Sequence, residues 1–255
     1  MTIVAPAAEC MPSTKMHSMP GTWGAANWNT PAFDPETGIF YAASNTIPYI
    51  NDLVAPADPK ATMKYALRQV PGPPPPQAGA AGPAIQGPFG PTTAAGLTRS
   101  DRLQRMHEPM LDNGLPIFKP PYGRLTAIDL NKGDILWQVA NGDGPRNHPA
   151  LKGLNLPPLG TAGRPAPLVT KTLLFIGEGS DSIPGVPRDA FGSKFRAYDK
   201  ATGAVVWEME LPAGTTGAPM SYLFKGRQYI VVPIGGKNHA PEFIALALPA
   251  SPATQ

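Results

Sequence analysis

The chain has 255 residues, of which 34 are proline and 27 are glycine, and only 15% are charged. This composition argues against long amphipathic helices and favours loop-rich β structure. The formal net charge is +3 with lysine and arginine scattered along the chain, so no basic stripe supports nucleic-acid binding, and a nucleic-acid partner is not expected.

The amino-terminal region carries no targeting signal that we can recognise. The first residues lack the basic start and apolar run of a secretory signal, and no stretch reaches the roughly 18–20 apolar residues of a membrane span. Taken as it stands, the chain has no export signal; alternatively, its first residue lies inside a longer protein. The single cysteine, Cys10, excludes an internal disulfide and leaves the redox compartment open.

The first elements expected are a strand end at residues 3–6 and an unusual passage at residues 21–35. That passage contains Trp23 and Trp28, separated by small residues, with the amide of Asn27 beside the second indole. Small residues let a backbone approach a ligand closely, and an amide next to a flat apolar ring is a common lining for a planar ligand. The same tryptophans could be core residues of a sheet, and spacing alone favours that interpretation.

Strands are expected next at residues 39–43, 47–54 and 62–70. An insertion follows at residues 71–113. Up to residue 96 it is rich in proline, glycine and alanine and cannot bury enough surface to order itself, so it is predicted to be exposed and mobile. Residues 97–113 carry mixed charge, which is compatible with a short helix.

A repeated pattern is the strongest signal in the sequence. Residues 127–137 and 197–207 both follow the frame Ala-x-Asp-x-x-x-Gly-x-x-x-Trp, and residues 33–41 contain a weaker copy without the tryptophan. Each full copy predicts a strand, a reversal and a returning strand that ends on an indole. Such self-similar units are typical of sheets repeated around an axis, as in β-propellers.

The residues of the repeat explain its turn. Asp129 and Asp199 can accept hydrogen bonds from backbone N–H groups two or three residues on, and Gly133 and Gly203 can take the positive φ that closes such a turn. A tryptophan at the end of the returning strand supplies a large apolar surface and needs an acceptor for its N–H. We therefore expect both tryptophans of the repeat to be buried.

Further hairpins are expected at residues 167–177 and 194–210, and a last sheet at residues 217–248. The loop at residues 141–160 holds a polar cluster of Asp143, Arg146, Asn147 and His148. His148 could act as a ligand or base, although a lone loop histidine is more often solvated or hydrogen-bonded. Lys237 and His239 could face a cavity, although a solvated turn is the better interpretation.

The sequence contains no recognisable catalytic motif. It has no glycine-rich phosphate loop, no histidines and cysteines at metal-binding spacing, no Gly-x-Ser-x-Gly elbow and no obvious paired carboxylates. The residues by themselves therefore assign no catalytic residue and no metal ligand.

Three passages together resemble the carboxy-terminal part of the quinoprotein dehydrogenases, which are eight-bladed β-propellers that oxidise alcohols or sugars with pyrroloquinoline quinone. They are residues 24–41, 122–157 and 168–232, and their order along the chain matches the family as well as their content. The resemblance implies an all-β fold, a partial β-propeller of about three to four four-stranded blades. Residues 1–255 would form the carboxy-terminal portion of that propeller, with the Pro/Gly-rich insertion at residues 71–113.

The resemblance also implies a site and its partners. The family's counterpart of the Asn27–Trp28 pair contacts the quinone, so both residues are expected to line the cofactor. The implied cofactors are pyrroloquinoline quinone and calcium, with the calcium ligands and the catalytic aspartate outside this chain. The implied partners are a small alcohol or sugar substrate, a quinone or cytochrome electron acceptor, and the missing amino-terminal half of the propeller, in the periplasm.

Two functions remain open at this point. The chain is either a piece of a quinoprotein dehydrogenase that is inactive alone, or a propeller-like binding or scaffold module that kept the fold and lost the cofactor.

Overall fold

The computed structural model describes residues 15–20, 24–26, 30–54, 60, 62, 66–69, 85–87, 90–92, 111, 115–179, 192–236 and 239–248. Within these residues the regular elements are strands, apart from two short 3-10 helices, η2 (Gly144–Asn147) and η3 (Pro149–Leu151). The all-β expectation is therefore confirmed. Neither of these single-turn helices in the described part of the chain could cross a lipid bilayer.

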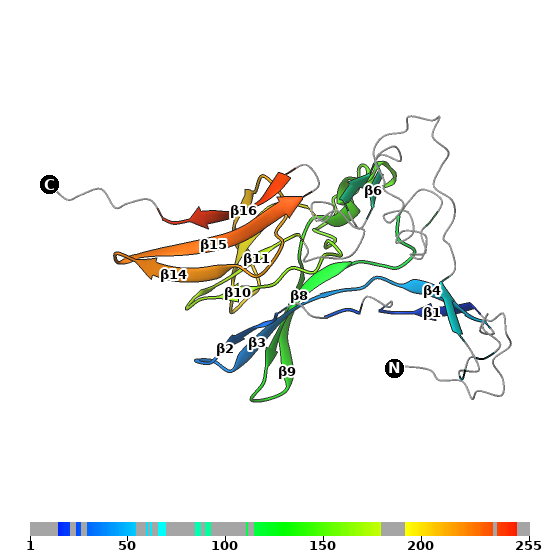
Figure 1. Cartoon of the computed structure of the whole chain (residues 1–255), viewed down its shortest axis with the longest axis horizontal. Coiled ribbons are helices and arrows are strands. Elements are labelled where there is room, and N and C mark those ends of the chain that lie inside the picture. The colour runs from blue at the N-terminus through cyan, green and yellow to red at the C-terminus, as the bar shows by residue number, and fades with distance from the viewer. Residues whose placement is uncertain are drawn as a thin grey trace.

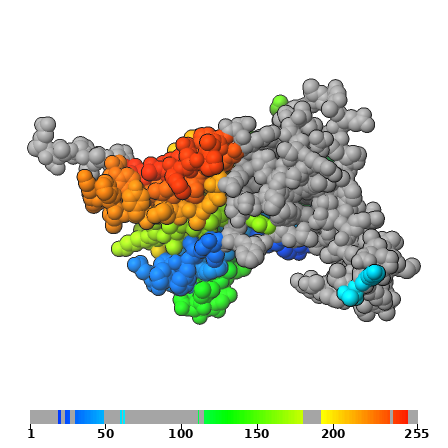
Figure 2. Space-filling model, in the orientation of Figure 1, coloured from blue at the N-terminus to red at the C-terminus, as the bar shows by residue number. Residues whose placement is uncertain are grey.

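Three antiparallel sheets form the body of the molecule and follow one another as layers (Figure 1). The first sheet has the order β2 (Ala32–Asp34), β3 (Ile39–Asn45), β8 (Gly123–Asp129), β9 (Asp134–Ala140). The second has the order β10 (Leu168–Val169), β11 (Leu173–Gly177), β12 (Lys194–Asp199), β13 (Val205–Glu210). The third has the order β14 (Met220–Phe224), β15 (Arg227–Gly236), β16 (His239–Leu246). Figure 2 shows the same order as stacked bands from the blue and green first sheet to the orange and red third sheet. Successive sheets of this kind are the arrangement expected for part of a propeller.

The remaining strands belong to the region before β8. β1 (Lys15–Ser18), β4 (Tyr49–Val54) and β5 (Ala66–Gln69) form one small sheet, and β6 (Ile85–Gly87) pairs with β7 (Gly90–Thr92). β4 and β5 are shorter than the predicted strands at residues 47–54 and 62–70. Two short strands also occur where we expected no ordered structure, between residues 71 and 96. The expected helix lies almost entirely outside the described residues, as do the strand end at residues 3–6 and Cys10.

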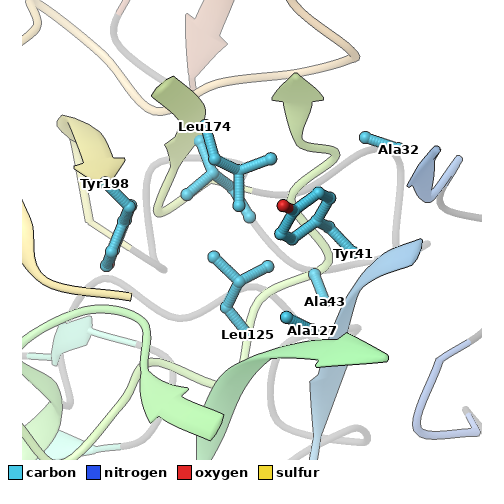
Figure 3. Close-up of a cluster of buried hydrophobic side chains, with 8 residues drawn as sticks. Ala32, Tyr41, Ala43, Leu125, Ala127, Leu174 and Tyr198 are labelled. Atoms are coloured by element: carbon cyan, nitrogen blue, oxygen red, sulfur yellow. The ribbon is translucent and has the colours of Figure 1, made fainter. Parts of the chain in front are cut away.

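Two apolar cores join the three sheets. In the first core, Tyr41 and Leu125 of the first sheet meet Leu174, Ile176 and Tyr198 of the second (Figure 3). These residues alternate along their strands, which places them on one face of each sheet. The second core lies between the second and third sheets and consists of Phe195, Leu211, Ala213, Val232 and Ile234. Both faces of the second sheet are therefore covered.

The turns of the repeat form as predicted. The Asp129 carboxylate accepts hydrogen bonds from the backbone N–H groups of Asn131 at 2.9 Å and Lys132 at 3.3 Å. The Asp199 carboxylate accepts the equivalent bonds from Ala201 at 3.0 Å and Thr202 at 2.8 Å. The closing glycines have positive φ, +79° at Gly133 and +73° at Gly203.

The two tryptophans of the repeat differ in burial. The Trp137 indole is half-buried and donates its N–H to the Lys200 carbonyl oxygen at 3.2 Å. The prediction that Trp207 is buried is wrong, because this side chain is 42% exposed. The turn of the second hairpin covers Trp137, and within the described residues no equivalent turn covers Trp207.

Candidate functional site

The pair that sequence reasoning assigned to the cofactor, Asn27 and Trp28, lies outside the described residues, and so does Trp23. The structure does describe residues 24–26, immediately before this pair. Ala25 is attached to the end of β3, where its carbonyl oxygen accepts hydrogen bonds from the backbone N–H of Asn45 at 3.2 Å and from Asn45 Nδ2 at 3.3 Å. Asn45 therefore binds the peptide of Ala25, two residues before the Asn27–Trp28 pair in the sequence.

Asn45 has an unmet hydrogen-bonding group. It is 3% exposed, and its Oδ1 atom is buried with no hydrogen-bond donor among the residues that the structure describes. An unmet buried acceptor costs about 1–3 kcal/mol, and such atoms in native proteins mark functional positions or places where a water or ligand binds. An acceptor of this kind beside residues 24–26 can receive a hydrogen bond from a ligand that brings a donor.

A second buried asparagine at the same end of the first sheet has its hydrogen bonds satisfied. Asn141 follows β9, and its backbone N–H donates to the carbonyl oxygen of Gly123, the residue that pairs with Asn45 across the sheet. Its Nδ2 donates to the Gly177 carbonyl at 3.0 Å, and its Oδ1 accepts from the Tyr198 hydroxyl at 2.9 Å. Burial raises the pKa of Tyr198 to about 12, so the hydroxyl remains a donor at neutral pH. Asn141 therefore joins the first and second sheets.

The chain segment that follows η3 forms a close-packed wall at this end of the sheets. The Leu159 carbonyl accepts from the backbone N–H of Tyr122, and the Thr161 N–H donates to the Asn141 carbonyl. A Cβ atom added to Gly123 would lie 1.8 Å from the Thr161 carbonyl oxygen, so only glycine permits this approach. Residues 159–167 are buried.

A cluster of charged side chains connects the loop after β9 to the second sheet. Arg196 of β12 pairs with Glu178, and both side chains are almost fully buried, at 5% and 6% exposure. Arg196 also donates to Glu208 at 3.0 Å, and Lys194 donates to Asp143 at 3.0 Å. Asp143 lies in the loop that leaves the first sheet, so the cluster joins that loop to β12.

The pKa shifts in the cluster follow from burial and charge. Burial raises the pKa of Glu178, and this effect is only partly offset by the Arg196 guanidinium. Burial alone would also raise the pKa of Asp143, but the hydrogen bond and charge of Lys194, followed by the charges of Arg146 and Arg196, outweigh burial and lower it. The hydrogen bond from Lys194 lowers the pKa of Glu208. Each carboxylate has a cationic partner, which makes the cluster a structural connection between two layers.

The two candidate histidines are hydrogen-bonded. His148 is buried, and its Nδ1 atom accepts from the backbone N–H of Ala150 at 3.1 Å, capping η3. The interpretation of His148 as a solvated or hydrogen-bonded loop histidine is confirmed in its hydrogen-bonded form. His239 contacts the Glu242 carboxylate through Nε2 at 2.8 Å, and Lys237 lies outside the described residues.

No metal centre can be assigned in the part of the chain that the structure describes, where no three histidine, cysteine, aspartate or glutamate side chains gather in a way that could hold an ion. Sequence reasoning did not single out Asn45 or the Glu178–Arg196 pair. A signal existed for Asn45, because it occupies the buried face of β3 after Tyr41 and Ala43, where a polar residue is exceptional.

The layered antiparallel sheets, with Trp137 of the first packed on the turn of the second, define a chain of the β-propeller class. The family model "PQQ: Glucose/ethanol/alcohol dehydrogenase, beta-propeller domain" matches residues 3–230, so the chain belongs to this family of pyrroloquinoline quinone-dependent dehydrogenases. The resemblance inferred from the sequence is confirmed at this level.

Individual relatives agree with the family. The chain is 31% identical to the glycerol dehydrogenase large subunit of Gluconobacter thailandicus, over 90% of this chain and 29% of that protein. It is 30% identical to a probable quinate dehydrogenase (quinone) of Xanthomonas campestris pv. juglandis, over 91% of this chain and 27% of that protein. The chain thus spans less than a third of the length of these relatives.

A solved structure supports the fold. The crystal structure of quinohemoprotein alcohol dehydrogenase from Comamonas testosteroni superposes with a TM-score of 0.51 at 21% identity, covering 95% of this chain and 28% of that one.

Proposed function

We propose that this chain is the carboxy-terminal part of a quinoprotein dehydrogenase propeller and supplies one wall of a pyrroloquinoline quinone site. The observation that carries the proposal is the family match over residues 3–230 in a chain that covers less than a third of its relatives. The whole protein would oxidise an alcohol or a sugar and pass electrons to a quinone or a cytochrome, in the periplasm. The chain alone would not turn over substrate.

The residues assigned to the wall are Asn27 and Trp28. An indole face binds a planar ring by stacking, and an amide beside it can fix the ring's orientation through hydrogen bonds. Asn45 is hydrogen-bonded to Ala25, which lies two residues before this pair in the sequence. Its unmet acceptor supports a ligand site here. Bound there, the quinone would supply the oxidising chemistry, with calcium as a Lewis acid held by residues outside this chain.

The outer face of the third sheet supports a missing partner. Met220, Tyr222 and Phe224 of β14 and Phe243 of β16 lie on the face opposite Val232 and Ile234, and all four are exposed, Phe243 at 77%. Exposed apolar faces of this kind mark interaction sites. Because both faces of the second sheet are covered by neighbouring sheets, we propose that the rest of the propeller covers this face in the same way.

A titration with pyrroloquinoline quinone tests the cofactor proposal. We expect the quinone to quench the tryptophan fluorescence of the chain, and a Trp28→Phe variant to lose most of this response. Trp207→Phe is the matched control, because its indole is exposed on β13, and it should respond like the wild type. An unchanged response in Trp28→Phe would contradict the assignment, and no quinone response in any variant would favour the scaffold alternative.

An assay with quinone, calcium and a dye acceptor tests the proposed inactivity. No dye reduction is expected from the chain alone with alcohols or sugars, and robust reduction would contradict the proposal.

Sizing chromatography tests the exposed face. We expect the isolated chain to self-associate and a Phe243→Glu variant to do so less, because the substitution places a charge on the apolar face. A sharp monomeric peak for the unmodified chain would contradict an open face that needs a partner.

A further inference from the structure

We propose that the turn between β14 and β15 is a contact site for an anionic lipid membrane. The tip of this hairpin, defined as residues 223–227, combines the apolar side chains of Leu223 and Phe224 with the cationic side chains of Lys225 and Arg227. This contact is separate from the proposed quinone site and does not depend on it.

The tip lies at the same end of the sheets as the turns of the repeat. Arg227 donates a hydrogen bond to the Leu248 carbonyl oxygen, just after the end of β16. β16 is the third strand of its sheet, as are β8 and β12, whose ends lead into the repeat turns. Asn45 pairs with Gly123 at the other end of the first sheet. A partner bound at the tip therefore leaves that other end free.

The equivalent hairpins of the other two sheets have polar turns. Residues 35–38 join β2 to β3 with the sequence Pro-Glu-Thr-Gly, and residues 170–172 join β10 to β11 with Thr-Lys-Thr. In the third sheet, by contrast, Leu223 is 74% exposed and Phe224 is 55% exposed. Since the other hairpins turn without apolar side chains, this adjacent pair is not needed for the turn and indicates a contact with an apolar partner.

The exposure of Leu223 does not result from the uncovered outer face of the third sheet. Leu223 pairs with Gln228, so the alternation of strand side chains places it on the same face as Val232, toward the second sheet. The second sheet is present but does not reach Leu223, because the β14–β15 hairpin extends beyond the ends of β2 and β10 (Figure 1). A neighbour that covered the outer face would therefore leave Leu223 exposed.

The charge of the tip is complementary to a negatively charged surface. No aspartate or glutamate occurs between Glu210 and Glu242. Among the residues that the structure describes, neither Lys225 nor Arg227 forms an ion pair. The Lys225 ammonium lies 5.4 Å from the centre of the Phe224 ring, so the cation and the ring form one surface. Such cations bind anionic headgroups while their apolar neighbours enter the interface.

A lipid surface fits this tip better than an acidic protein does. A stable protein interface buries roughly 800 Å² on each partner and requires a broad complementary surface. The apolar part of the tip is only two side chains on a projecting turn. A membrane receives a narrow projection without shape complementarity, and long cationic side chains beside apolar ones are favoured where headgroups meet acyl chains.

Flotation with lipid vesicles tests the proposal and separates bound chain from aggregated chain, because aggregates sink. The chain should float with vesicles of phosphatidylcholine and phosphatidylglycerol, but not with phosphatidylcholine alone. Lys225→Asn with Arg227→Gln should lower the partition coefficient about fivefold for each charge removed. Leu223→Ser should lower it about tenfold. Asparagine suits position 225, where φ is +49°.

Matched controls make the same changes at other turns of this end. Lys132→Gln with Lys171→Gln removes the same net charge from exposed lysines, and Leu130→Ser replaces a leucine that is 55% exposed. Both controls should float like the unmodified chain. As a direct measure of insertion, the emission of Leu223→Trp should shift to the blue on anionic vesicles and be quenched by brominated acyl chains, unlike that of Leu130→Trp.

Three results would overturn the membrane contact. The first is a chain that does not float with the anionic vesicles. The second is an equal loss of flotation in the tip variants and their controls, which would assign binding to net charge. The third is binding to polyglutamate, weakened by the tip variants, without flotation or quenching of Leu223→Trp, which would assign the tip to an acidic protein partner.

Discussion

The hairpins at residues 127–137 and 197–207 share a motif, but the surroundings of their two tryptophans differ. Trp137 donates to the Lys200 carbonyl, and its ring packs on Gly203 in the turn of the second hairpin. Trp207 has no such cover within the described residues, and 42% of its surface is exposed. Gly133, the counterpart of Gly203, faces open space. The motif therefore has two complementary parts, an indole that contacts the next sheet and a turn that receives an indole.

The pairs next to the motif differ as well. In the first hairpin the Gln138 amide donates to the Thr126 hydroxyl across the strands at 2.9 Å. In the second hairpin the equivalent positions hold Arg196 and Glu208, joined at 3.0 Å, and Arg196 is paired in addition with buried Glu178. The pair across β8–β9 is thus neutral, whereas the pair across β12–β13 is ionic.

Substitutions in the cross-strand pairs should give the largest difference in lost folding stability between the two hairpins. Arg196→Met should destabilise the fold by about 3–5 kcal/mol, because it leaves the Glu178 carboxylate buried without its cation. Thr126→Val, the matched change in the first hairpin, should cost about 1 kcal/mol. Urea denaturation measures both. Adding Glu178→Gln to Arg196→Met should recover much of the loss, and equal effects of the two single variants would contradict the contrast.

The tryptophans provide the next test. Trp137→Ala should cost about 3 kcal/mol, since it removes an indole packed between two sheets together with its hydrogen bond. Trp207→Ala should cost less than about 1 kcal/mol, because much of its surface is already in water. Denaturation curves measure both losses. Equal falls in the two midpoints would contradict the expected difference between Trp137 and Trp207.

Substitution of the two closing glycines should give a smaller difference in stability than substitution of the two tryptophans. Both have positive φ, so Gly133→Ala and Gly203→Ala should each lose about 1 kcal/mol to backbone strain. The added methyl at Gly203 would also lie 2.8 Å from Trp137 Cε3, which adds about 1–3 kcal/mol of overpacking. In a Trp137→Ala background this extra cost should disappear, and a double-mutant cycle of thermal stabilities measures it. An additive cycle would show that ring and turn are not coupled.

The smallest effect concerns pH and the Asp34–Lys200 pair, at 2.6 Å. The hydrogen bond from Lys200, followed by that from Thr37, lowers the pKa of Asp34 below its ordinary value of 3.8. The folded pKa lies below the unfolded one, so the stabilisation is complete above pH 3.8 and is lost as the pH falls through the folded pKa. Asp34→Asn should lose about 1 kcal/mol at pH 7 and converge with the wild type in acid. Thermal melts of the two proteins from pH 7 to pH 2.5 measure this difference in stability. In a Lys200→Met background, Asp34→Asn should no longer change the stability at pH 7.

The parts of the fold that could be predicted from sequence are those set by neighbours along the chain. Asp129 and Gly133 determine their own turn, because carboxylate-to-backbone bonds and positive φ are local properties. The exposure of Trp207 could not be predicted in this way, because its burial depends on what the next sheet presents.

The same limit applies to the site. Asn27 and Trp28 were assigned by resemblance, which requires no knowledge of contacts. Asn45 could not be identified from the sequence, because its distinguishing features are a buried acceptor and a hydrogen bond to Ala25, twenty residues earlier. The partnership of Glu178 with Arg196 likewise depends on two strands pairing, and neither residue belongs to a recognisable motif.

The contact between the first two sheets has a consequence for how substitutions should be interpreted. The Lys200 carbonyl oxygen accepts from both the Trp137 indole and the Tyr41 hydroxyl, while the Lys200 side chain reaches only Asp34 among the bonds described above. Every amino acid carries that oxygen. Leu130, the equivalent residue of the first hairpin, shows that the repeat does not require a lysine there. Natural variation or saturation mutagenesis at position 200 would therefore leave the acceptor in place, and would underestimate how strongly this single peptide group holds two blades together.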